Sequence, residues 1–148
     1  MTLLLSLVVA LLAGALVTLQ TGSNARLKEA FGQALPAVVV SSAIGVALLL
    51  SIVLASRTPL PSAERALAAP WTAWLGGVLG AGYAVAVVVL ARDLGAATLT
   101  ALVVTGQLTC SVLLDHFGLL GFEPHAASAL RLIGCGLLLA GTFLIWKF

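Results

Sequence analysis

Charged side chains are scarce in this sequence, because Asp, Glu, Lys and Arg together make up only 8% of its 148 residues. Hydrophobic residues make up 61%, and the mean hydropathy is +1.20. About a quarter of the residues of a typical soluble domain are charged, since its surface has to face water. The composition therefore excludes a soluble globular protein and predicts an integral membrane protein.

Other scarcities exclude further classes of protein. The net charge is only +2 and no basic patch occurs, so a nucleic-acid-binding surface is not expected. The two cysteines, Cys110 and Cys135, lie in predicted helices and form no disulfide framework. The N-terminus has no basic segment before its apolar run, which predicts a first span rather than a cleaved signal peptide. No Ser/His/Asp arrangement, phosphate-binding loop or dinucleotide fingerprint is present, so we expect neither an enzyme nor a cofactor.

What remains is a set of long apolar stretches. About 20 apolar residues cross a bilayer core as a helix, because each residue adds about 1.5 Å. We therefore predict an all-α, polytopic membrane protein that forms one transmembrane domain over residues 1–148. Its five transmembrane helices are expected at residues 2–21, 33–55, 70–91, 94–114 and 127–146. The proline-containing connection before Pro70 is expected to lie outside the membrane, with a short helical turn around Glu64.

The fourth span differs from an inert anchor because a primary amide, Gln107, lies deep inside it. An amide that faces lipid leaves its hydrogen-bonding positions unmet, at a cost of several kcal/mol. We therefore expect Gln107 to face protein or a water-filled cavity. Two residues turn a helix by about 200°, so Gln107 and Ser111 face one way while Thr105 and Thr109 face nearly the opposite way. One face would serve packing and the other a cavity, and the pattern leaves open which.

Other polar side chains in the spans are candidates for the same cavity. Gln20 and Asn24 share a face of the first helix, because they are four residues apart. They indicate either a capped helix end, closed by Asn24 or Gly22, or a cavity wall that Gln20 shares with Gln107. The candidate solute-binding residues are therefore Gln107, Gln20, Asn24, Tyr83, Thr105 and Ser111.

Glycines recur at helical spacing within the spans. Gly76 and Gly80 form a GxxxG pattern, and Gly134 and Gly141 lie two turns apart on the fifth helix. Small residues let helices approach closely in lipid, so these positions predict packing seams. Gly77, beside Gly76, adds flexibility to the third helix, and the fifth helix is the expected site of much of a dimer contact.

Four possible metal ligands follow the fourth span, namely Asp115, His116, Glu123 and His125. Their spacing matches no defined metal site, so we expect no metal there, and favour proton sensing by His116 beside Asp115. No Asp or Glu lies at the centre of any span, where a cation-binding transporter would be expected to carry one. Amides, hydroxyls and helix N-termini suit a neutral or anionic solute instead.

Four segments resemble the YdcZ family, and together they cover most of the chain. They read GALVTLQTGSNARL, PWTAWLGGVLGAGY, LGAATLTALVVTGQLTCSVLLDHFGLLG and RLIGCGLLLAGTFLI. The resemblance implies a small five-helix protein of the drug/metabolite transporter superfamily, located in the inner membrane. Larger relatives have ten helices in two inverted five-helix repeats, so this chain would be half of a transporter. The small multidrug resistance branch carries a carboxylate in its first helix, and this sequence has none there, which weakens a cation-export function.

These observations favour a small-solute transporter that works by alternating access as an antiparallel homodimer in the lipid bilayer. Five spans place the termini on opposite sides, with Arg57, Arg65 and Arg131 on the side of the N-terminus. The other side carries Arg26, Lys28, Arg92 and Lys147, so the Lys/Arg excess that normally orients a chain nearly vanishes. We expect the chain to insert both ways. The alternatives are a non-transporting membrane subunit or assembly factor that binds partner helices, and a metal-responsive channel.

Overall fold

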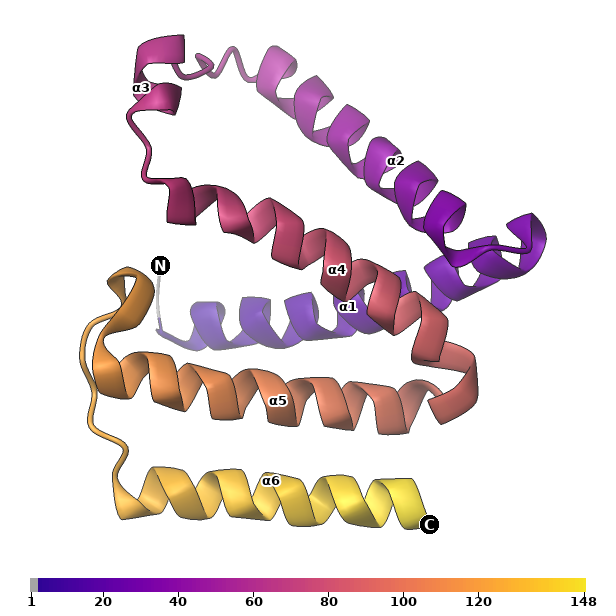
Figure 1. The fold of residues 1–148 in the computed structure, drawn as a ribbon, viewed down its shortest axis with the longest axis vertical. Coiled ribbons are helices and arrows are strands. Elements are labelled where there is room, and N and C mark those ends of the chain that lie inside the picture. The colour runs from indigo at the N-terminus through magenta and orange to yellow at the C-terminus, as the bar shows by residue number, and fades with distance from the viewer. Residues whose placement is uncertain (1–2) are drawn as a thin grey trace. The chain divides into compact units, whose positions relative to one another are not determined.

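The computed structural model describes residues 3–148 and contains five long helices (Figure 1). The elements are α1 (Leu3–Phe31), α2 (Ala34–Ala55), α3 (Ala63–Leu67), α4 (Trp71–Leu94), α5 (Ala96–Phe117), the 3-10 turn η1 (Leu119–Gly121) and α6 (Ala129–Lys147). No β-strand occurs among the residues that the structure describes. All five long helices are long and apolar enough to cross a membrane, which confirms the all-α, five-span fold. The predicted first residue of the first span, residue 2, lies outside the described residues.

The first helix is longer than predicted, because it runs to Phe31 rather than ending at residue 21. The hydroxyls of Thr21 and Ser23 donate to the carbonyls of Val17 and Leu19, both at 3.0 Å, so these polar residues bond within their own helix. Good helix formers follow in the segment 25–30, and they offset the cost of about 1 kcal/mol for a glycine within a helix. The alternative of a capped helix end at Gly22 or Asn24 is therefore wrong.

Gly32 ends α1 instead, with a φ of +72°. This left-handed conformation is the usual way in which a glycine terminates a helix. At about 1.5 Å per residue, the 29 residues of α1 extend about 43 Å, which exceeds the roughly 30 Å of a bilayer core. The last turns of α1, which carry Lys28 and Glu29, therefore reach beyond the hydrocarbon region when the helix is steep.

The connection between α2 and α4 contains the predicted helical turn. The short helix α3 includes Glu64, and the hydroxyl of Ser62 caps it by accepting a hydrogen bond from the backbone N–H of Arg65 at 3.4 Å. A Ser at this position satisfies a backbone donor that the first helical turn leaves free. The expected helical turn around Glu64 is confirmed.

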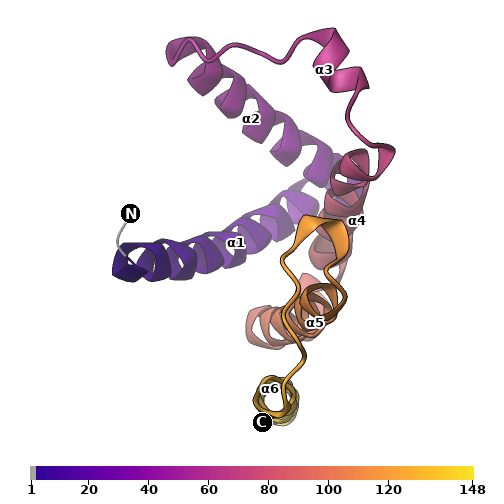
Figure 2. The same ribbon diagram turned by 90° about the vertical axis from the view of Figure 1, so that its left-hand side faces the viewer.

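The chain divides into two compact units, one ending at Arg92 and the other running from Asp93 to Phe148. In the first unit, α1 and α2 diverge from their connection at Gly32, as Figure 2 shows. The buried residues of this unit come from the last turns of α1, the first turns of α2 and the second half of α4; they are Asn24, Ala37, Val38, Val87 and Val88. The core of the first unit therefore lies near one end of its helices.

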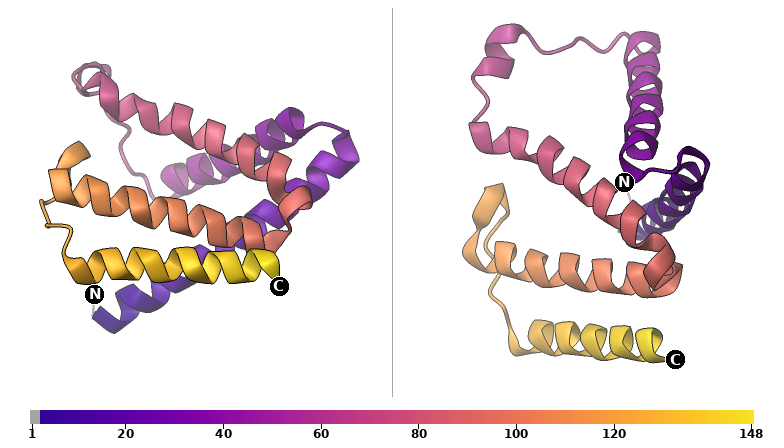
Figure 3. Two further views of the ribbon diagram at one scale, coloured as in Figure 1. Left: turned by 60° about the horizontal axis from the view of Figure 1, so that its bottom comes forward. Right: turned by 45° about the vertical axis from the view of Figure 1, so that its right-hand side comes forward.

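The second unit is a helical hairpin in which α5 and α6 lie side by side and antiparallel (Figure 3). Gly118 ends α5 with a φ of +61°, and a Cβ atom there would lie 2.9 Å from Cγ of Pro124. Only glycine fits both the backbone and the space at this corner. Ser128 then caps α6 by accepting a hydrogen bond from the backbone N–H of Arg131.

Candidate functional site

The two polar faces of α5 have different environments. Thr105 is buried, and its hydroxyl lies 2.7 Å from the hydroxyl of Thr142 on α6, which is buried as well. Thr142 also donates to the backbone carbonyl of Ala101 at 3.3 Å. Because a hydroxyl has one proton, Thr105 is the donor and Thr142 the acceptor between the two side chains. The Thr105 side of α5 therefore packs against α6, and a cavity on the opposite face remains a prediction.

The opposite face of α5 carries the exposed side chains of Gln107 and Ser111. Gln107 lies at the midpoint of α5, and its amide has no hydrogen-bond partner among the described residues of the second unit. In the hydrocarbon core no water is available to take the place of a partner, so an amide left in this state costs several kcal/mol. The single chain thus presents a strong, unpaired hydrogen-bonding group at the centre of a span.

The remaining predicted solute contacts belong to the first unit. Asn24 is only 6% exposed, whereas Gln20, one turn earlier on α1, is exposed. Tyr83, on α4, is 38% exposed. The structure therefore places Asn24 in the packed end of the first unit, while Gln20 and Tyr83 project from its surface.

The glycines expected to form packing seams have open surroundings. A Cβ atom built at Gly76, Gly77, Gly80, Gly134 or Gly141 would meet no heavy atom of the described residues within 4 Å, apart from the glycine's own helix and chain neighbours. These glycines are therefore not used for close helix contacts within their own units. Their packing role remains a prediction for contacts with a partner.

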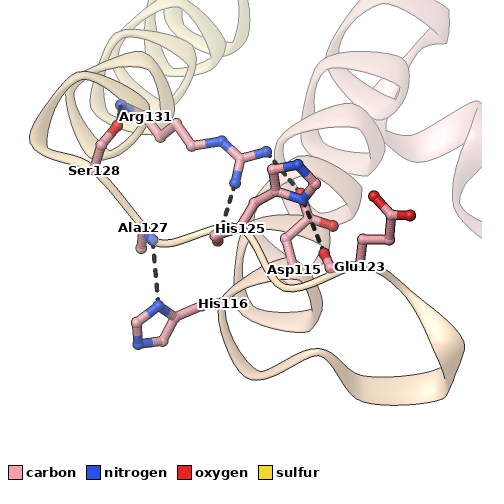
Figure 4. A network of polar contacts seen from close by, with 7 residues as sticks. All are labelled: Asp115, His116, Glu123, His125, Ala127, Ser128 and Arg131. Atoms are coloured by element: carbon pink, nitrogen blue, oxygen red, sulfur yellow. Dashed lines mark hydrogen bonds and ion pairs between the residues drawn. The ribbon is translucent and has the colours of Figure 1, made fainter.

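The connection between α5 and α6 is held by polar contacts, which Figure 4 shows in detail. Arg131 donates to the carboxylate of Asp115 at 2.7 Å and to the carbonyl of His125 at 3.3 Å. The backbone N–H of His125 donates in turn to the carbonyl of Asp115 at 2.7 Å. These bonds join the last turn of α5 to the first turn of α6.

Both histidines of this connection are bonded to the backbone. The Nδ1 atom of His116 accepts from the N–H of Ala127 at 3.2 Å, and Nδ1 of His125 lies 2.8 Å from the carbonyl of Glu123. A carbonyl only accepts, so the bond of His125 requires a proton on its Nδ1, whereas Nδ1 of His116 must lack one. Within residues 3–148, no group of three or more His, Cys, Asp or Glu side chains is placed to hold a metal ion. The arrangement closes the α5–α6 turn.

The sequence did not predict a polar link between α1 and α4. Nζ of Lys28 donates to the carbonyls of Val88 and Val89, at 3.5 and 3.1 Å, and Arg92 forms an ion pair with Glu29. Lys28 and Glu29 lie beyond the helix end expected at residue 21, so the sequence did not predict that they share a helix that reaches α4. The adjacent, oppositely charged Lys28 and Glu29 were the available signal.

Comparison with known proteins gives one match. A family model described as "Putative inner membrane exporter, YdcZ" matches residues 5–144. No curated protein and no solved structure matches the chain. Together with the five apolar helices, the match identifies a multi-pass protein of the inner membrane and supports a transporter. The matched family is one of exporters and not one of enzymes.

Proposed function

The chain belongs to the YdcZ family, and from that premise we propose that it carries a small solute across the inner membrane by alternating access, as an antiparallel homodimer. Two five-helix chains in opposite orientations provide the ten helices of an inverted repeat. Such repeats bind solute near the middle of the bilayer, where polar groups line a cavity. No covalent bond changes in this process; the solute biases an equilibrium between two states of the dimer.

The exposed amide of Gln107 is the observation that carries this proposal. It lies at the midpoint of α5, on the face turned away from the Thr105–Thr142 contact. Because α6 occupies the threonine face, the amide face is free to line a cavity. Ser111, one turn along the same face, adds a hydroxyl. A group this costly in lipid is best accounted for by a polar solute and water that it meets during transport.

The distribution of basic residues supports the antiparallel arrangement. One arginine on each side of the membrane is held in an ion pair, Arg92 with Glu29 and Arg131 with Asp115. Each side of the membrane therefore has one basic residue neutralised by an ion pair. The numbers of unpaired basic residues on the two sides still differ by one. Orientation follows the Lys/Arg excess in short loops, so neither orientation is strongly favoured.

The solute class follows from the groups available. Gln20 and Tyr83 are exposed on helices of the first unit and can offer further hydrogen bonds. Asn24 is the additional amide at the packed end of α1. None of these groups carries a charge, which favours a neutral solute or an anion over a cation. The open surroundings of Gly76, Gly77 and Gly80 allow α4 to bend as access alternates.

The test is transport by the purified protein in proteoliposomes, with a panel of neutral, anionic and cationic metabolites and drugs. We expect saturable uptake of one or more neutral or anionic solutes, and thermal stabilisation of the protein by the same compounds. Uptake of cations alone would contradict the proposed solute class. No uptake of any compound, together with copurification of a different membrane protein, would support an assembly or subunit role instead.

A further inference from the structure

We infer that the Gln107 side chains of two copies share one binding site, at the point where their α5 helices cross. This inference rests on the antiparallel dimer proposed above and specifies its site. It predicts that the second copy supplies the hydrogen-bonding partner that Gln107 lacks within the second unit of its own chain.

Gln107 lies at the centre of a helix that spans the membrane. The 22 residues of α5 extend about 33 Å, close to the thickness of a bilayer core, so the midpoint of the helix lies near the middle of the membrane. A twofold axis in the membrane plane brings a residue at this depth to nearly the same depth in the partner. Gln107 is the residue nearest to that midpoint whose side chain is a strong hydrogen-bonding group.

One face of α5 is not covered by α6. Thr105 and Thr142 fix α6 on one side of α5, so α6 leaves the side of Gln107 uncovered. The same side carries Val103 and Cys110, since residues spaced by three or four positions are neighbours on a helix surface. Cys110 is exposed and Val103 is partly exposed. This face of the second unit thus combines apolar residues with a central amide and the neighbouring hydroxyl of Ser111, which suits a second copy of itself better than lipid.

The chemistry of two amides defines the ligand. Each glutamine side chain offers two N–H donors and a carbonyl acceptor, so the pair presents both kinds of group at the centre of the membrane. A solute held between them would itself carry donors and acceptors and no positive charge, as an amide, a urea or a polyol does. With no solute bound, each amide can satisfy the other across the axis.

Disulfide cross-linking in native membranes tests this arrangement with the full-length chain. All copies carry Cys135→Ala, and one set carries Cys110→Ala with Gln107→Cys. At about 1.5 Å per residue, an axis at the helix midpoint puts the two positions 107 within about 2 Å in depth, so they should cross-link. Leu108→Cys is the matched control, because position 108 is exposed at nearly the same depth but lies about 100° around the helix. It should cross-link at least several-fold less.

A pair of different copies separates the antiparallel from the parallel case. One copy carries Val103→Cys with Cys110→Ala, and the other, with a tag of a different size, keeps its native Cys110. Positions 103 and 110 lie at equal distances on either side of the midpoint of α5. Position 103 of one copy and position 110 of the other therefore lie at the same depth only when the two copies are antiparallel. Two native Cys110 residues would then be about 10 Å apart in depth and should not cross-link.

The outcomes distinguish the inference from the function on which it rests. Cross-links at 107–107 and 103–110, without 110–110, are expected. Strong 110–110 and 103–103 cross-links without 103–110 would show a parallel dimer and would overturn both the shared site and the proposed antiparallel transporter. An antiparallel dimer that forms no cross-link at any of these positions would overturn the shared site alone. Gln107 would then face another part of its own chain or another surface of the partner.

Discussion

Replacing Gln107 by leucine is expected to weaken solute binding and leave the fold intact. The amide has no hydrogen-bond partner among the described residues of the second unit, so the substitution breaks no bond inside that unit. Leucine is a good helix former of similar volume and suits an exposed position in a span, so the free energy of unfolding should change by no more than about 0.5 kcal/mol. A solute group left without its buried partner costs about 1–3 kcal/mol, which corresponds to an affinity loss of about 5- to 150-fold.

The assay compares the dissociation constant and the initial uptake rate of Gln107→Leu with those of the unmodified protein, using a solute identified in the proteoliposome panel. Thr105→Val is the matched control, because it also removes a polar group near the middle of α5, but on the face that contacts α6. The control should lower stability and keep solute affinity. Unchanged affinity in Gln107→Leu, with loss of affinity in Thr105→Val, would refute the assignment of the two faces. Unfolding of Gln107→Leu would show that the amide holds helices together.

Three further predictions concern the contacts of the structure. In a double-mutant cycle of Thr105→Val and Thr142→Val, measured by reversible unfolding in detergent, the coupling free energy should be about 0.5–1.5 kcal/mol. Additive effects of the two substitutions would contradict the hydroxyl contact. Replacing Gly134 and Gly141 by leucine should dissociate the dimer in mild detergent and keep the protomer helical, since both positions have open surroundings within one chain; an intact dimer by mass would locate the contact elsewhere. Asp115→Asn should cost at most about 1 kcal/mol of stability and less at high salt, because the Asp115 and Arg131 side chains are partly exposed; a loss above about 3 kcal/mol would indicate a buried pair.

Much of the fold follows from apolar length alone, and its exceptions have physical causes. The spans α2, α4, α5 and α6 begin and end close to the predicted residues, because charges and prolines mark their ends. The end of α1 was misplaced, because Gly22 and Asn24 are typical of helix ends when read one at a time. Their neighbours Thr21 and Ser23 bond to their own helix, which composition does not reveal.

The candidate site was predictable only in part. Helical periodicity separated the faces of Gln107 and Thr105, but the choice between them needed the position of Thr142 on α6. Thr142 is the one hydroxyl residue within α6, and that was the available signal for an interhelical bond. The glycine pattern did not predict contacts within the chain, because a small residue permits a close approach without requiring one. The pairing of Asp115 with Arg131 depends on the path of the turn between them, which spacing does not define.

Transport by chains of fixed orientation tests the antiparallel dimer most directly. Arg57→Gln with Arg65→Gln leaves one basic residue, Arg131, on the side of the N-terminus and four on the other side. Arg26→Gln, Lys147→Gln and Leu60→Arg together reverse the balance to four against two, so each variant should adopt one orientation. Reporters at the C-terminus verify the two orientations before solute uptake is measured. We predict that neither variant transports alone and that co-expression restores uptake. Full transport by either variant alone, with all its chains in one orientation, would contradict the antiparallel dimer.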